Sequence, residues 1–141
     1  MIKIVPYFDD DYTEVKALLE KNGMWYDTDN RNIFKKIANP DIYARYGEFL
    51  LAKKDDKLLG VIHYVFNPWL SIIYHFCSEN TNATFKLYNT VVRAIKSRGG
   101  EYIAGYILED NEKMLKLSEK MGFEKYPKPC YAIGKKLWLY V

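Results

Sequence analysis

Residues 110–123 restrict the fold of this chain more than any other segment, because they contain a helix together with its start and its end. Asp110 and Asn111 belong to the residue types that cap helix N-termini. An amphipathic stretch follows and stops at Gly122, a residue type that commonly ends helices. Phe123 then begins an extended segment. The sequence therefore predicts a helix over residues 110–121 that leads back into β-structure.

The rest of the chain alternates between strand-like and helix-like patterns. Apolar, β-branched and aromatic residues predict strands at residues 2–5, 49–53, 58–66, 69–76, 102–108, 130–133 and 137–141. Caps and helical spacing predict three more helices, at residues 11–22, from Thr28 or Asp29 to 39, and from Asn80 or Asn82 to 98. Asp11 is the expected cap of the first helix. The expected buried stripe of the long helix comprises Phe85, Tyr88, Val92 and Ile95.

This order of elements predicts a three-layer α/β/α fold of the α+β type. Helices cover both faces of a mixed, mostly antiparallel sheet, and residues 1–141 form a single domain. Residues 49–76 are expected to form an antiparallel meander with a polar connection at residues 54–57. The strand at residues 102–108 alternates weakly, so we expect it to be central and buried on both faces.

A family resemblance is found in the last helix. Asn111, the apolar pair that follows it and the run Glu119-Lys120-Met121-Gly122-Phe123 resemble the closing segment of GCN5-related N-acetyltransferases, the GNAT family. The order of elements resembles that family over nearly the whole chain. The resemblance implies a splay between the strands at residues 69–76 and 102–108. It also implies acetyl-CoA as co-substrate and direct transfer of its acetyl group to a primary amine, on a small molecule or a protein.

Composition is consistent with this expectation. The net charge of +3 is too small to indicate nucleic acid and suits an anionic small ligand. The two cysteines lack metal-binding spacing, so no metal site is expected. The sequence has no membrane-spanning stretch and no signal-peptide pattern, which predicts a cytoplasmic protein without membrane contact. The resemblance further suggests a homodimer paired through the tail strand.

The resemblance places the cofactor at the end of the strand at residues 69–76 and in the loop that follows it. Glycines of the family loop are replaced here by Asn82 and Thr84, and its arginine or glutamine by Glu79. A register shifted by one residue would place Asn80, Ala83 and Phe85 there instead. Asparagine tolerates left-handed backbone well, so the asparagines could preserve the loop shape. Capping alone would also explain them. The expected cofactor contacts are Phe76, Cys77, Asn80, Asn82, Ala83, Thr84, Lys86 and Asn111.

Three residues are candidates for proton transfer. The resemblance places Ser118 where the family has the tyrosine that protonates the leaving thiolate, and Tyr131, Tyr126 and Tyr106 are alternative donors. His75 is the candidate base, because histidine titrates near neutrality and lies near the strand end. Strict alternation would place it on the same face as Ser71 and Ile73. A hydrogen-bonded structural histidine is the other interpretation, and His63 is expected to lie farther away.

The acceptor pocket implied by the resemblance lies at the connection between the first two helices. Trp25 and Tyr26 beside Asp27 suit a cationic amine, although a packing role for the aromatic pair is an alternative. Three functions stay open: an N-acetyltransferase, a non-catalytic module of the same fold that binds a ligand or partner, and an enzyme that transfers a longer acyl group from another carrier.

Overall fold

The computed structural model describes residues 1–22, 47–132 and 135–141. Its strands are β1 (Lys3–Pro6), β2 (Glu48–Lys54), β3 (Lys57–Val65), β4 (Leu70–Ser78), β5 (Tyr102–Leu108), β6 (Cys130–Ala132) and β7 (Lys135–Tyr140). Its helices are the short 3-10 helix η1 (Asp9–Asp11), α1 (Tyr12–Lys21), α4 (Thr81–Ser97) and α5 (Glu112–Lys120). The helix predicted from Thr28 or Asp29 to residue 39 lies outside the described residues.

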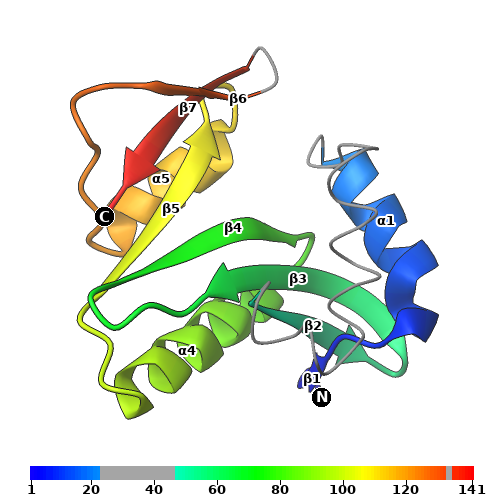
Figure 1. The fold of residues 1–141 in the computed structure, drawn as a ribbon. Coiled ribbons are helices and arrows are strands. Elements are labelled where there is room, and N and C mark those ends of the chain that lie inside the picture. Colours follow the sequence, from blue (N-terminus) through cyan, green and yellow to red (C-terminus); the bar gives the residue numbers. More distant parts are fainter. Residues whose placement is uncertain (23–46, 133–134) are drawn as a thin grey trace.

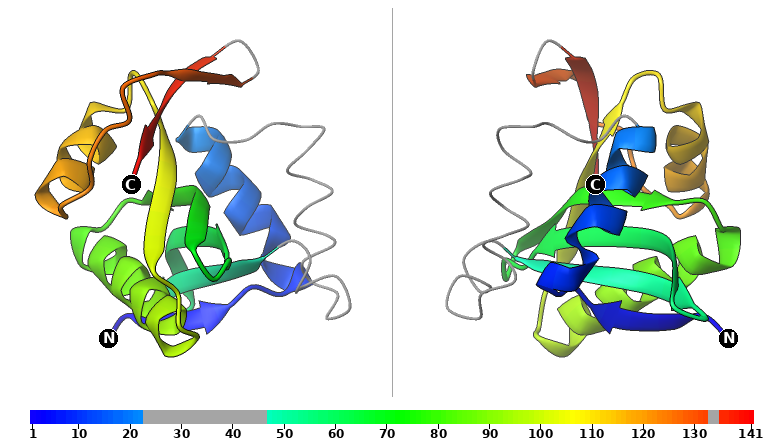
Figure 2. Two further views of the ribbon diagram at one scale, coloured as in Figure 1. Left: turned by 60° about the vertical axis from the view of Figure 1, so that its left-hand side comes forward. Right: turned by 90° about the vertical axis from the view of Figure 1, so that its right-hand side faces the viewer.

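The described strands form one seven-stranded sheet in the order β1-β2-β3-β4-β5-β7-β6. Only β4 and β5 run parallel; the other neighbours are antiparallel. Helix α1 lies on one face of the sheet, and α4 and α5 lie on the other (Figures 1 and 2). This confirms the predicted mixed sheet between helical layers.

The meander β2-β3-β4 is built from local sequence signals. The connection between β2 and β3 is a tight turn in which Asp55 and Asp56 adopt positive φ angles of 51° and 65°. This conformation fits the right-handed twist of a two-residue hairpin, and aspartate tolerates it better than most residues. The predicted polar connection is therefore confirmed.

Strand β4 contains a bulge that the alternation of its sequence did not predict. His63 of β3 pairs with His75, and the next residue, Tyr64, pairs with Ile73, so Tyr74 is an extra residue in β4. Ile73 packs in the core beneath α4, whereas His75 stacks on Phe49 from the core beneath α1. The expectation that Ile73 and His75 share a face was wrong, because a bulge shifts the alternation by one residue.

Two helix starts also differ from expectation. Asp11 does not cap α1; its carboxylate accepts a hydrogen bond from the Phe8 backbone N–H and pairs with Lys53 Nζ at 2.6 Å. Helix α4 is capped by Asn80, whose Oδ1 accepts from the Ala83 N–H at 3.0 Å. Of the two predicted caps, Asn80 is therefore the one used.

The buried faces were predicted in part. Helix α4 buries Ala83, Thr84, Leu87, Val91 and Ile95. Phe85, expected in that stripe, is 42% exposed, because it lies one position away from the buried row. Strand β5 is central, but Tyr102 and Tyr106 on one of its faces are exposed, so the expectation of burial on both faces was wrong. No helix among the described residues has the length and apolar character needed to cross a bilayer.

Candidate active site

The parallel strands β4 and β5 separate partway along their length. Their pairing covers only four positions and ends at Ile73 opposite Gly105, although β4 continues to Ser78 and β5 to Leu108. Beyond the last pair the two strands no longer contact each other through the ladder, so the sheet opens (Figure 1). The predicted splay is present.

A cavity of about 320 Å³ lies in this opening. Its walls come from both strands, from the start of α4, from α5 and from the end of α1. The lining residues are Asn22, Phe76, Cys77, Ser78, Thr84, Leu108, Asp110, Asn111, Lys113, Met114 and Leu117. The volume is within the range of small-molecule sites.

Four of the predicted cofactor contacts line this cavity: Phe76, Cys77, Thr84 and Asn111. The Oδ1 atom of Asn111 caps α5 by accepting from the Met114 N–H at 3.3 Å, so its amide nitrogen is not used by the cap. The cavity face of α5 also includes Met114 and Leu117. These residues follow Asn111 at intervals of three, so helical spacing could have identified them from the sequence.

The loop between β4 and α4 serves helix capping. Asn80 has an extended backbone (φ −135°, ψ 123°), because a capping side chain requires it, so the left-handed loop expected there is not formed. Asn82 and Ala83 lie inside α4, and Ala83 is fully buried. Lys86 donates to the carbonyl of Ile2 at 3.1 Å, which directs its amine toward the N-terminus of the chain.

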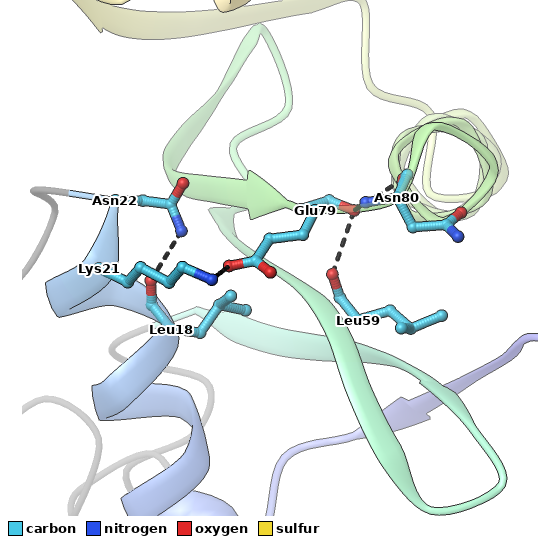
Figure 3. Close-up of polar contacts among 7 residues, drawn as sticks. Leu18, Lys21, Asn22, Leu59, Glu79 and Asn80 are labelled. Atoms are coloured by element: carbon cyan, nitrogen blue, oxygen red, sulfur yellow. Dashed lines mark hydrogen bonds and ion pairs between the residues drawn. The ribbon is translucent and has the colours of Figure 1, made fainter.

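Glu79 is directed away from the start of α4. Its carboxylate pairs with Lys21 of α1 at 3.0 Å, and its backbone N–H donates to the Leu59 carbonyl (Figure 3). Both side chains of the ion pair are well exposed. The Lys21 ammonium compensates the charge that would otherwise repel an anionic ligand near this loop. The next residue of α1, Asn22, already lines the cavity.

Cys77 contributes a neutral thiol to the cavity wall. Burial raises its pKa to about 12, and the nearby Glu79 carboxylate adds to this effect. A thiol is nucleophilic only as the thiolate, so Cys77 acts as a small apolar wall residue at neutral pH.

His75 forms a buried pair with His63. Their Nδ1 atoms lie 3.2 Å apart, so one ring donates and the other accepts. The His63 ring stacks on Phe49 at 4.2 Å between centroids. Burial lowers the pKa of His75 to about 3, with a further contribution from His63. The expectation that His63 lies farther away was wrong, because β3 and β4 place the two histidines directly opposite each other.

The remaining candidates are positioned less favourably. Ser118 is 5% exposed, and it is not one of the described residues that line the cavity. The backbone of Tyr131 pairs with Lys136 in β6, which β7 separates from β5. The side chain of Tyr131, like Trp25, Tyr26 and Asp27, lies outside the described part of the chain. The described residues contain no group of three or more side chains suited to hold a metal ion.

The sequence matches no family model, and no curated protein matches it. The fold, in contrast, is similar to many solved structures. A probable acetyltransferase from Staphylococcus epidermidis superposes with a TM-score of 0.80 at 16% identity, covering 99% of this chain and 97% of the other. A GNAT family acetyltransferase from Elizabethkingia anophelis with acetyl-CoA bound gives 0.68 at 18% identity, covering 99% and 95%. Arabidopsis thaliana Naa50, in complex with a bisubstrate analogue, gives 0.74 at 15% identity, covering 99% and 96%. The chain has the fold of the GNAT acetyltransferases.

Proposed function

We propose that the protein is an acyl-CoA-dependent N-acetyltransferase that transfers an acetyl group from acetyl-CoA to a primary amine. The supporting observation is the cavity of about 320 Å³ in the opening between β4 and β5. The fold relatives include a GNAT acetyltransferase with acetyl-CoA bound and a Naa50 complex with a bisubstrate analogue. A thioester could lie in this opening with its carbonyl beside the free backbone of β4.

The start of α4 offers a place for the anionic part of the donor. The first N–H groups of any α-helix lack intrahelical acceptors and carry partial positive charge. Asn80 uses the Ala83 N–H, which leaves the N–H groups of Thr81 and Asn82 for a phosphate. Lys113 on the cavity wall adds a mobile cation. The amide nitrogen of Asn111 can donate to a carbonyl of the pantetheine arm.

The reaction would proceed by direct attack. The amine nitrogen forms a bond to the thioester carbon, the carbon–sulfur bond breaks, and one proton leaves the nitrogen while the thiolate of CoA gains one. His75 is unprotonated at neutral pH, so it can accept that proton, and its low pKa means that it would pass the proton on at once. With Ser118 outside the cavity wall, water or a tyrosine such as Tyr106 would protonate the thiolate.

Ligand-induced stabilisation tests the donor site. A ligand present at a hundredfold excess over its Kd stabilises the native state by about 2.7 kcal/mol, which raises Tm by several degrees for a chain of this size. We expect such a shift with acetyl-CoA, followed by thiol release when primary amines are added. No shift with acetyl-CoA, CoA or a longer acyl-CoA would contradict the proposal.

A non-catalytic binding module is the second candidate. It is favoured by Ser118, which stands where relatives of this type have a tyrosine and is buried away from the cavity. Thermal stabilisation by acetyl-CoA without thiol release across the amine panel would identify this module.

The pair between Lys21 and Glu79 provides a sharper test of donor binding. Substitution Lys21→Ala leaves the Glu79 carboxylate uncompensated near the α4 start, so we expect acetyl-CoA to bind about three- to fivefold more weakly. The double variant Lys21→Ala/Glu79→Gln should recover the affinity, because it removes both charges. Calorimetric titration measures all three proteins, and equal affinities would show that the anionic group binds elsewhere.

A further inference from the structure

Two tyrosines stand at the point where the sheet opens. The last paired residues of β4 and β5 are Ile73 and Gly105, so Tyr74 and Tyr106 are the first residues beyond the ladder. Ile73 belongs to the core beneath α4, and Gly105 is its same-side partner, since a Cβ built there would lie 3.8 Å from the Ile73 Cβ. Tyr74 and Tyr106 therefore project to the opposite face.

A ring contact supports this placement for Tyr74. Its ring lies 5.7 Å from that of His63, which stacks on Phe49 of the core beneath α1. Despite its place near the middle of the sheet, Tyr74 is 47% exposed and Tyr106 is 37% exposed. Large aromatic side chains that stay exposed beside a cavity are candidates for ligand contact.

The face around these tyrosines is apolar. Residues two apart on a strand share a face, and directly paired residues of neighbouring strands do so as well. The members of this face on β4, β5 and β7 are Ile72, Tyr74, Ala104, Tyr106, Leu108, Leu137 and Leu139. None of these seven described residues is charged. We call this set the apolar face.

The apolar face is continuous with the cavity. Leu108 belongs to the face and also lines the cavity. The cavity reaches the same side of the sheet through Asn22, at the end of α1. Helix α1 packs over β3, and the views in Figure 2 show it beside the opening on the side away from α4 and α5. A substrate with its reactive atom in the cavity would therefore extend over Tyr74 and Tyr106.

We propose that the apolar face binds the acceptor, and that the acceptor is a primary monoamine with a large apolar or aromatic group close to its nitrogen. This inference rests on the proposed function. The apolar group lies against the two tyrosine rings and Leu139, while the amine reaches the thioester at the opening of the sheet. A single ammonium can be held by cation–π contact with tyrosine. A second charged group would lose its hydration against a face that offers no carboxylate.

The test compares 2-phenylethylamine with 1,4-diaminobutane, at saturating acetyl-CoA. We expect kcat/KM to favour 2-phenylethylamine at least tenfold. Substitutions Tyr74→Ala and Tyr106→Ala should each raise its KM about tenfold, as loss of about 1.4 kcal/mol of contact would do, and leave the KM of acetyl-CoA unchanged. The variants Tyr74→Phe and Tyr106→Phe keep the ring and should stay within about threefold. Tyr126→Ala is the matched control, because Tyr126 is 54% exposed and lies outside the apolar face.

Direct binding separates this inference from the proposed function. Calorimetry of 2-phenylethylamine with the CoA-loaded protein should show binding that Tyr74→Ala and Tyr106→Ala both weaken, even in a protein that does not turn over. Preference for the diamine, or alanine variants that behave like the parent, would overturn the inference and leave the acetyltransferase intact. Absence of both turnover and binding for 2-phenylethylamine would also overturn it.

Discussion

At the scale of single residues, the histidine pair is the least expected feature. The chain contains only two histidines, and the sheet brings both together across β3 and β4. A neutral pair is stable there because each ring supplies what the other needs, a donor or an acceptor. A charged imidazolium would lose its hydration in the same place. The pair therefore depends on neutral pH.

This dependence predicts a loss of stability in mild acid. The pKa of His75 is lowered to about 3 in the folded chain, against 6.5 for an exposed histidine, so the unfolded state binds a proton first as pH falls. Stability is then fully present above pH 6.5 and is lost as pH drops toward 3, by at most about 1.4 kcal/mol per pH unit. Urea unfolding across this range measures the slope.

The variant His75→Asn is the matched comparison. Its side chain keeps a polar atom near the position of Nδ1 but does not titrate. We expect its stability to fall less steeply between pH 6.5 and 4 than that of the parent chain. Parallel curves for the two proteins would show that His75 is not desolvated in solution.

The sequence could identify His75 but not its surroundings. Histidine near the end of a strand was visible, and its side on the sheet was not. One inserted residue, Tyr74, reverses the alternation, and no residue type marks a bulge of this kind. Pairing between distant positions such as His63 and His75 depends on strand register, which the pattern of a single strand leaves open.

At the scale of elements, local signals were sufficient where one residue fixes the backbone. Asn111 begins α5 and the glycine at 122 follows its end, with φ of 87°. Two asparagines near the start of α4 were equally suitable from the sequence. Only the path of the chain after β4, which extends two residues beyond the predicted end, makes Asn80 the cap.

The two asparagines provide a controlled stability test. Substitution Asn80→Ala removes the acceptor of the Ala83 N–H and should lower the free energy of unfolding by about 1 kcal/mol. Asn82→Ala changes an exposed position inside the helix and should alter it by less than about 0.5 kcal/mol. Chemical denaturation of both variants measures the difference, and a larger effect at Asn82 would place the helix start elsewhere.

At the scale of the whole molecule, the order of elements predicted the fold, and the opening of the sheet followed from it. The cavity walls were harder to predict, because they combine the ends of elements far apart in sequence, from Asn22 to Leu117. Helical spacing from Asn111 indicates one wall. The contribution of α1 depends on tertiary packing, for which a single sequence gives no signal.

Filling the cavity tests its role directly. Substitution Leu117→Trp adds an indole to the wall, so we expect the rise in Tm caused by acetyl-CoA to fall to less than half. Leu115→Trp, on the same helix but not on the cavity wall, should leave that rise unchanged. If both variants respond to acetyl-CoA like the parent chain, the donor binds outside this cavity.

The ion pair between Lys21 and Glu79 joins the helix on one face of the sheet to the connection that leads into the helix on the other. A ligand that draws Lys21 toward itself must release Glu79, and a rearrangement of α1 changes the charge near the start of α4. By thermodynamic reciprocity, an occupant on the α1 side and an anion at α4 must alter each other's affinity by the same factor. One exposed ion pair thus gives the two sides of the sheet a route to cooperativity.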